Sequence, residues 1–234
     1  MPFPQTVSVI IPALNEAGNI AELVAAVLTQ PVEQVIVVDN GSSDDTGARA
    51  RAAGALVLRE DRRGYGYACA AGLAAATGEI LVFLDGDFSF SPAELPRLIE
   101  PIQQGAADLV LGSRVLGQIA PGAMPPHQRF GNRLTAWLMG LLYRVNVTDL
   151  GPYRAVRSDL LRGLGMAEMT YGWPTEMMVK AARLGSQRGA RIQEVPVSYA
   201  SRRAGKSKVS GTVRGSLLAG WYILSVTVRY ARRK

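Results

Sequence analysis

The chain has 234 residues, of which 48% are hydrophobic and 19% are charged, and this composition excludes an intrinsically disordered protein. A single cysteine, Cys69, excludes an internal disulfide framework and fits a reducing compartment. The net charge of +7 is unevenly placed, because from Lys180 onward there are thirteen Lys or Arg residues and one acid, Glu194.

Strand and helix signals alternate along the first half of the chain. Short apolar runs predict strands, and the segments between them predict helices, the first of which carries apolar residues at helical spacing. The expected strands are residues 7–11, 35–38, 56–58 and 80–84, and the expected helices are residues 17–28, 44–53 and 65–76. Continuous apolar strands separated by helices predict a mostly parallel sheet covered on both faces, which is a Rossmann-like α/β fold.

The second half of the chain is less regular. Its patterns predict strands at residues 109–111 and 191–197, a long apolar helix at 129–143 and an amphipathic C-terminal helix at 213–230. We expect no signal peptide and no integral membrane segment, because the late apolar stretch 217–228 is shorter than the roughly 20 residues that span a bilayer. With no internal repeat or linker, the chain is expected to be a single domain.

Polar clusters follow three of the predicted strands. They comprise residues 12–16, 39–42 and 85–87. In doubly wound sheets ligands bind beyond the carboxyl ends of the strands, so these clusters predict one acidic pocket at an edge of the sheet. Each cluster taken alone would also suit an ordinary turn, since turns favour Asp, Asn and Gly.

Neither a G-x-G-x-x-G fingerprint nor a G-x-x-x-x-G-K-S/T loop is present to bind a diphosphate. A divalent cation held by Asp85 and Asp87 would neutralise that charge instead, because hard carboxylate oxygens suit Mg²⁺ or Mn²⁺. The alternative is a plain turn with two solvated acids.

Three runs resemble the signatures of family 2 glycosyltransferases with the GT-A fold. They are Val9 to Glu16, Val37 to Thr46 and Phe83 to Asp87. More closely, the chain is similar to the dolichol-phosphate mannosyltransferase and polyprenyl-phosphate glycosyltransferase group. Further matches are Gly112-Ser113-Arg114, Glu194 to Val197, and Arg202 to Lys208, which fits the group's R-x-x-G-x-S-K pattern.

The resemblance implies a donor site for a GDP- or UDP-linked sugar. Asp39 is expected to contact the nucleoside base, and the residues expected around it are Pro12, Leu14, Glu16 and Gly41. Asp85 and Asp87 are expected to meet the metal, Mg²⁺ or Mn²⁺, and the ribose and diphosphate of the donor. The resemblance also divides the single domain 1–234 into a nucleotide-sugar-binding half (1–115), an acceptor-side half (116–210) and a basic amphipathic helix (211–234).

Four residues are expected to serve the transfer step together with Asp87. Arg114, Arg202 and Lys208 resemble the cations around the donor diphosphate and the acceptor phosphate, where they would stabilise developing negative charge. Glu176 falls where related inverting enzymes place an acid near the acceptor. It could be a general base for a hydroxyl acceptor, a residue that mainly orients a phosphate acceptor, or a buried salt-bridge partner of a nearby Arg or Lys.

The expected activity is inverting transfer of a hexose to a polyprenyl- or dolichyl-phosphate acceptor. Two alternatives stay open: a soluble or glycolipid hydroxyl acceptor, and a catalytically inactive nucleotide-binding module. The chain departs from the group at Ser89, where Gln is frequent, and at residues 149–154, which replace a D-x-x-S-G-F-R pattern and are one residue shorter. These departures bear on the metal geometry and the acceptor.

The basic C-terminal third predicts contact with a membrane surface. Trp221, Tyr222 and Tyr230 lie in the last predicted helix beside its cations, as in helices that lie in the lipid interface. The expected location is therefore cytoplasmic, with peripheral contact at the inner face of the membrane; a core helix with solvated ends would look much the same. No nucleic-acid partner is expected, and the single histidine, His127, predicts no zinc site.

Overall fold

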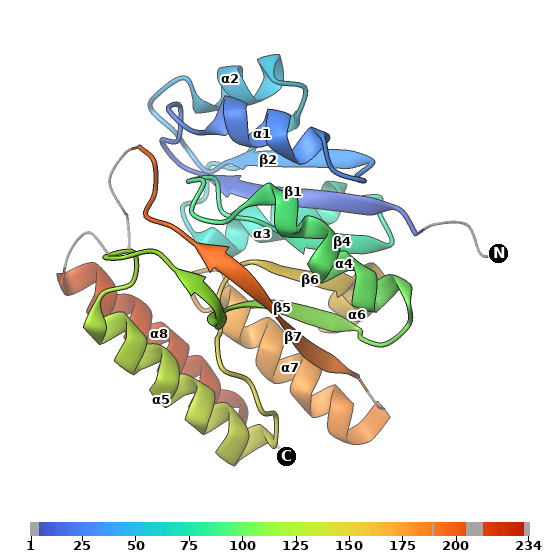
Figure 1. Ribbon diagram of the computed structural model, residues 1–234, viewed down its shortest axis with the longest axis vertical. Helices are drawn as coiled ribbons and strands as arrows, with labels where there is room; N and C mark the ends of the chain where they lie inside the picture. Colours follow the sequence, from blue (N-terminus) through green and yellow to red (C-terminus); the bar gives the residue numbers. More distant parts are fainter. Residues whose placement is uncertain (1–4, 189, 205–212, 232–234) are drawn as a thin grey trace.

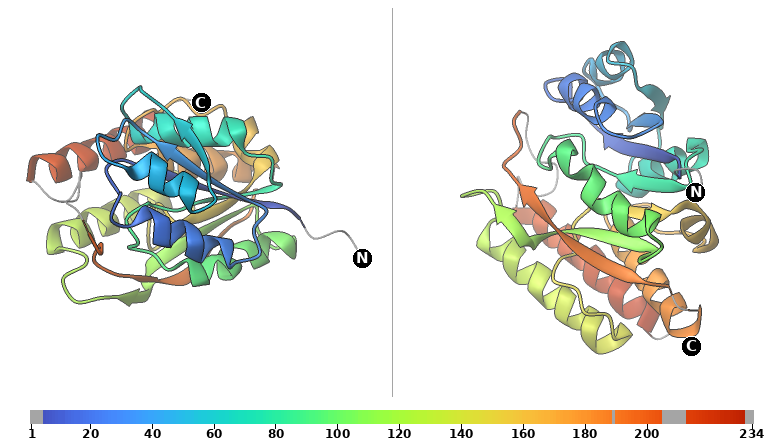
Figure 2. Two further views of the ribbon diagram at one scale, coloured as in Figure 1. Left: turned by 90° about the horizontal axis from the view of Figure 1, so that it is seen from above. Right: turned by 45° about the vertical axis from the view of Figure 1, so that its right-hand side comes forward.

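The computed structural model describes residues 5–188, 190–204 and 213–231. These residues form a seven-stranded sheet in the order β3-β2-β1-β4-β6-β5-β7, with helices on both faces (Figures 1 and 2). The strands are β1 Val7–Ala13, β2 Gln34–Asp39, β3 Leu56–Arg59, β4 Ile80–Phe83, β5 Leu109–Ile119, β6 Arg154–Arg157 and β7 Ile192–Tyr199. The helices are α1 Ile20–Leu28, α2 Thr46–Ala52, α3 Tyr65–Ala75, α4 Leu95–Gln103, α5 Pro126–Tyr143, α6 Ser158–Gly163, α7 Trp173–Arg188 and α8 Val213–Ala231, and the short 3₁₀ helix η1, Pro92–Glu94, precedes α4.

The sheet is mostly parallel, as predicted. Strands β1 to β4 pair in parallel, and β5 pairs in parallel with β7. Only β6 runs antiparallel, and it lies between β4 and β5. The predicted C-terminal helix is also present as α8. The expected α/β fold class is therefore confirmed.

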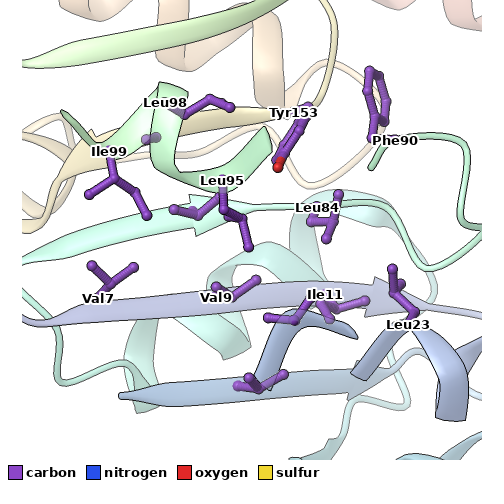
Figure 3. Packing of buried hydrophobic residues seen from close by; sticks show 14 of the residues in the cluster. Val7, Val9, Ile11, Leu23, Leu84, Phe90, Leu95, Leu98, Ile99 and Tyr153 are labelled. Carbon is purple, nitrogen blue, oxygen red and sulfur yellow. The ribbon is translucent and has the colours of Figure 1, made fainter. Parts of the chain in front are cut away.

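Strand β1 shows how the apolar pattern forms two cores. Val7, Val9 and Ile11 point to one face, where they pack against α1 and α4 (Figure 3). Ile10 points to the other face, where its cluster includes residues of α3 and α7. Because alternate side chains point to opposite faces, a strand that is apolar at every position must be covered on both sides.

Four elements were not predicted: α4, β6, α6 and α7. Helix α4 contains Pro96 and Pro101, which mask a helical pattern in the sequence. Strand β6 is only four residues long and has Arg154 and Arg157 at its ends, so it lacks the apolar run of the other strands. Its place in the sheet comes from pairing with β4 and β5, which a local pattern does not contain.

The carboxyl ends of β1, β2 and β4 lie at one edge of the sheet because these strands are parallel neighbours. In register, Ala13 of β1 stands beside Asp39 of β2. The segments that follow these strands therefore meet at this edge. Helices α5 and α8 lie side by side, and both begin on the side of the molecule toward which β1 and β7 point (Figure 1). In the described part of the chain, no helix has the length and apolar character that a membrane crossing requires.

Two helix glycines provide a test of how tightly α3 packs on the sheet. A Cβ at Gly72 in α3 would lie 2.4 Å from Cγ2 of Ile10, whereas one at Gly131 in α5 would meet no atom within 4 Å. We expect Gly72→Ala to lower the free energy of unfolding by about 1–3 kcal/mol through overpacking. Gly131→Ala should raise it by up to about 1 kcal/mol, because alanine is the better helix former. Urea unfolding of both variants measures the difference, and equal changes would contradict this packing.

Candidate active site

Asp39 ends β2 and is buried at the site edge. Its Oδ1 accepts a hydrogen bond from the backbone N–H of Ser42 at 2.8 Å, and its Oδ2 accepts one from Nη1 of Arg59 at 3.2 Å. Gly41 lies between Asp39 and Ser42 with φ of +83°, a conformation that glycine adopts without strain. This turn holds the carboxylate at the carboxyl end of the strand.

The turn after β1 is tied to the turn after β2. The backbone N–H of Asn15 donates to Oγ of Ser42 at 2.9 Å, and Oδ1 of Asn15 accepts from the N–H of Ser43 at 2.8 Å. The N–H of Glu16 donates to Oγ1 of Thr46 at 2.8 Å. These bonds bring the first two predicted polar clusters together in space.

Asp85 and Asp87 follow β4 and lie beside the β1 turn. Gly86, between them, lies against the carbonyl of Pro12 and the side chain of Glu16. Oδ1 of Asp85 accepts a hydrogen bond from the hydroxyl of Tyr65 at 3.1 Å. Burial, followed by the negative charge of Asp87, raises the pKa of Asp85 to about 7. Burial and the charge of Asp87 therefore both oppose the ionised form of Asp85 at this edge of the sheet.

Arg202 joins two of these acids. Its Nη2 donates to Oδ2 of Asp87 at 2.9 Å and to Oε1 of Glu16 at 3.1 Å. Burial alone would lower the pKa of Arg202, but the hydrogen bonds and charges of the two carboxylates offset it and leave the pKa above its ordinary value. The segment after β7, which carries Arg202, thus lies against the segments after β1 and β4.

The residues next to Arg202 extend this contact. The guanidinium of Arg203 lies 3.8 Å from the centre of the Phe88 ring. The carbonyl of Ala204 accepts a hydrogen bond from Nδ2 of Asn19 at 3.2 Å. Lys208, the last of the expected cations, lies outside the described residues.

The donor set of Asp85 and Asp87 suits a hard divalent cation. Within residues 5–188, 190–204 and 213–231, no group of three or more acidic, His or Cys side chains is placed to hold a metal ion. Mg²⁺ is commonly bound by one or two protein carboxylates, with phosphate and water oxygens completing the shell. These two carboxylates fit that arrangement, and burial together with the charge of Asp87 opposes the ionisation of Asp85.

Arg114, the next expected cation, is paired within the protein. Its Nε and Nη2 donate to the two oxygens of Asp149, each at 2.7 Å, and its backbone N–H donates to Oδ2 at 2.8 Å. Glu194 accepts hydrogen bonds from the backbone N–H groups of Thr148 and Asp149. Arg114 therefore orders the segment before β6, and its charge is largely balanced there.

Glu176 is fully buried near the start of α7. Its carboxylate accepts hydrogen bonds from the backbone N–H groups of Ala167 and Glu168, at 2.9 and 2.7 Å, and from the hydroxyl of Tyr230 at 2.5 Å, and it pairs with Nζ of Lys180 at 2.8 Å. Burial alone would raise the pKa of Glu176, but these donors outweigh it and hold the pKa below its ordinary value. This geometry matches the salt-bridge alternative for Glu176.

The segment that Glu176 binds, around Ala167 and Glu168, packs against α3, the helix that carries Tyr65. A Cβ at Gly66 would lie 2.4 Å from the carbonyl oxygen of Glu168, so the backbones of α3 and this segment are in direct contact. The N–H of Gly66 also donates to the carbonyl of Met169 at 3.1 Å. Tyr65, which binds Asp85, is the first residue of α3. Glu176 therefore contributes to the position of Tyr65 at the pocket.

Three residues in or near the acidic cluster were not predicted: Arg59, Tyr65 and Arg154. Arg59 and Tyr65 could have been found by extending the inspection of strand ends to β3 and the helix after it. Arg154 is 1% exposed, and its guanidinium donates to the carbonyl of Pro174 at 2.7 Å and to the carbonyls of Leu150 and Gly151. No sequence pattern distinguishes such a buried arginine from a solvated one.

The family model "Glycosyl transferase family 2" matches residues 8–165. An uncharacterized glycosyltransferase of Mycobacterium tuberculosis is 38% identical over 222 residues, which cover 94% of this chain and 98% of that protein. The undecaprenyl-phosphate mannosyltransferase of Micrococcus luteus is 34% identical over 224 residues, with 88% of each chain covered.

Solved structures show the same fold. The glucosyl-3-phosphoglycerate synthase from Mycobacterium tuberculosis, crystallised with Mn²⁺, UDP and glucosyl-3-phosphoglycerate, superimposes with a TM-score of 0.78. The likeness covers 97% of this chain and 80% of the synthase, at 25% identity. The same synthase has been solved with Mg²⁺ and UDP, with a TM-score of 0.76. The expected GT-A architecture is thereby confirmed.

The role of Glu176 as an anchor predicts a loss of stability when its carboxylate is removed. Glu176→Ala leaves Lys180 and the two backbone N–H groups without their shared acceptor, so we expect the free energy of unfolding to fall by about 3 kcal/mol or more. The matched control is Glu79→Ala, because Glu79 is exposed and should change stability by less than about 0.5 kcal/mol. Chemical denaturation of both variants gives the comparison, and similar values for the two would refute the anchoring role.

Proposed function

The chain belongs to glycosyl transferase family 2, and from this membership we propose that it transfers a hexose from a GDP- or UDP-linked sugar, with inversion, to a polyprenyl- or dolichyl-type phosphate. One observation carries the proposal: Glu16, Asp39, Asp85 and Asp87 gather at the carboxyl ends of three parallel strands, with Arg202 joining two of them. Ligands of doubly wound sheets bind at such an edge.

The donor nucleotide is proposed to bind between the turns after β1 and β2. Asp39 would accept hydrogen bonds from the base, since its carboxylate is held in place by Ser42 and Arg59. Pro12 and Leu14, from the end of β1 and the turn after it, would line the same pocket, and Gly41 would let the backbone approach the nucleoside. In this proposal Glu16 acts mainly through Arg202.

Mg²⁺ or Mn²⁺ is the proposed cofactor, held by Asp85 and Asp87. The solved synthase structures, which contain Mn²⁺ or Mg²⁺ with UDP, support this choice. The metal would supply positive charge against the donor diphosphate. The protein's own contribution is to hold the two carboxylates in position through Tyr65 and Arg202.

The transfer itself breaks one bond and forms another. An acceptor oxygen attacks the anomeric carbon, the bond from that carbon to the diphosphate oxygen breaks, and the nucleoside diphosphate leaves with the electron pair. In this proposal Arg202, which is bonded to Asp87, would stabilise the negative charge that develops, and Lys208 would assist it. Arg114 would act on the acceptor side by ordering Asp149 and the segment around it.

Two observations support a phosphate acceptor. A phosphate oxygen is ionised at neutral pH and needs no general base, and Glu176, the expected base, is buried with four donors on its carboxylate. The Micrococcus luteus relative is named as an undecaprenyl-phosphate mannosyltransferase. A lipid acceptor is embedded in a membrane, so the reaction would take place at the membrane surface. We therefore include peripheral contact with the inner face of a cytoplasmic membrane in the proposal.

A soluble acceptor is the second candidate. The glucosyl-3-phosphoglycerate synthase structures contain a small phosphorylated acceptor or its glucosylated product, and they match nearly the whole of this chain. A hydroxyl acceptor would need a base other than the buried Glu176. The inactive nucleotide-binding module is disfavoured, because the acidic pair and Arg202 are all present and Arg202 is bonded to Asp87.

The donor proposal predicts metal-dependent nucleotide binding. In calorimetric titrations with UDP and GDP, one nucleotide should bind more tightly in the presence of Mn²⁺, and Asp87→Ala should weaken that binding by roughly tenfold or more, since it removes a proposed metal ligand. Asp159→Ala is the matched control, because Asp159 is exposed and pairs with Arg157 away from the pocket. If neither nucleotide binds with or without metal, the proposed donor site is wrong.

The acceptor proposal predicts that Glu176 is dispensable for chemistry. Glu176→Gln, assayed well below its unfolding temperature, should keep the rate of sugar transfer within about tenfold of wild type, whereas loss of a general base costs roughly 10²–10⁴. The product should be a sugar phosphodiester, which mild acid hydrolyses more readily than an ordinary glycoside. An acid-stable product, or a larger fall in rate without loss of fold, would favour the hydroxyl acceptor.

A further inference from the structure

The outer face of α5 carries a stripe of large apolar side chains. Phe130, Leu134, Trp137 and Leu141 are spaced four, three and four residues apart, which places them on one side of a helix. Phe130 is 71% exposed, and Trp137 and Leu141 are each 62% exposed. Single exposed apolar residues are common on proteins, but a continuous stripe of this kind marks an interaction surface.

This stripe is not the face by which α5 packs on the protein. The buried residues of α5 are Thr135 and Met139, and Tyr143 donates its hydroxyl hydrogen bond to the carbonyl of Thr227 in α8. On a helical wheel these three positions lie roughly opposite Phe130 and Trp137. Helix α5 therefore has a core-facing side and a separate apolar side that the described chain leaves uncovered.

The charged side chains that α5 carries beside the stripe are arginines. Helix α5, of 18 residues, and helix α8, of 19, contain no Asp or Glu. Arg129 and Arg133 line the same surface hollow as Phe130 and Trp137. On α8, Trp221 is 69% exposed. Apolar and aromatic side chains bordered by cations, without acids, are the pattern of a helix that lies in the interface of an anionic bilayer.

A second copy of the chain fits this surface less well. An interface that uses the same patch on both copies would bring the Arg129 and Arg133 side chains of one copy near those of the other, and α5 offers no acid to balance them. A bilayer surface has no such difficulty, because phosphate groups accept from the arginines while the aromatic and leucine side chains enter the boundary between headgroups and acyl chains.

The position of the stripe relates it to the acceptor side of the pocket. Trp137 and Leu141 line a hollow with Thr148, and the next residue, Asp149, binds Arg114. Helix α5 begins on the side of the molecule toward which β1 and β7 point (Figure 1). We propose that the apolar stripe of α5 docks on the surface of a bilayer that contains anionic phospholipid. The inference deepens the proposed function, because a lipid acceptor would be met at such a surface.

The test is co-sedimentation of the full chain with phospholipid vesicles. The wild-type protein should bind vesicles of phosphatidylglycerol and phosphatidylcholine in equal parts, and should bind phosphatidylcholine alone more weakly. Trp137→Ser/Leu141→Ser should lower the partition coefficient by roughly tenfold or more, since two large side chains no longer enter the interface. Arg129→Gln/Arg133→Gln should reduce the preference for the anionic lipid.

The matched control replaces two exposed leucines elsewhere. Leu28→Ser/Leu56→Ser changes side chains that are 45% and 46% exposed on α1 and β3, near the opposite edge of the sheet, and should bind vesicles like wild type. Absence of wild-type binding to the anionic vesicles, or equal loss in both double variants, overturns the proposal. The proposal is also overturned if wild type binds no vesicles, forms a dimer in light scattering, and becomes monomeric in Trp137→Ser/Leu141→Ser.

Nucleotide titration of the same variants separates this proposal from the proposed function. Trp137→Ser/Leu141→Ser should keep the metal-dependent nucleotide affinity of wild type, because neither side chain lies at the acidic pocket. Vesicle binding without nucleotide binding would leave the docking surface in place and refute the donor site. Nucleotide binding without vesicle binding would support the donor site and refute the docking surface.

Discussion

The candidate site depends on one arrangement of charge, in which the guanidinium of Arg202 holds Glu16 and Asp87 together. Carboxylates at the ends of β1 and β4 would otherwise repel one another across a partly buried pocket, and the pKa of Asp85, raised to about 7, shows how strongly burial and Asp87 oppose a further negative charge. Because Arg202 follows β7, an edge strand of the sheet, these ion pairs also bring the segment after β7 against the segments after β1 and β4. A nucleoside diphosphate with its cation, as proposed, would offer an anion to the arginine and a cation to the aspartates.

Contacts away from the acidic side chains help to fix the position of Asp85. Glu176 fixes the backbone at Ala167 and Glu168, the carbonyls of Glu168 and Met169 meet α3 at Gly66, and Tyr65 at the start of α3 binds Asp85. An acid far from the metal site can therefore be important without touching a substrate. The Glu176 carboxylate is bonded to two backbone N–H groups, to Tyr230 and to Lys180.

Most strands of the sheet and the candidate acids could be predicted from the sequence. The role of a side chain could not be predicted where it depends on a partner that is distant in the sequence. Continuous apolar runs predicted β1, β2 and β4, and the polar clusters at their carboxyl ends pointed to Asp39, Asp85 and Asp87 as candidates, because both signals are local. Strand β6 was missed since its four residues become a strand only by pairing with β4 and β5. Two further features could not be predicted: the pairing of Arg114 with Asp149, 35 residues away, and the burial of Arg154. The sequence shows that an arginine is charged, but it does not show which atoms accept its hydrogen bonds.

Acidic side chains are unevenly distributed over this fold. The edge at β1, β2 and β4 gathers carboxylates that suit a cation and a nucleotide, whereas α5 and α8 have none. Between them lies the segment of Thr148 and Asp149, where Arg114 is neutralised by Asp149 and Glu194 receives only backbone and hydroxyl donors from this segment. An anionic headgroup that approaches along α5 would therefore meet arginines first and the acidic pocket last. In the proposed function, the donor and its cation would therefore bind before an anionic acceptor, because the cation would balance the negative charge at this edge of the sheet.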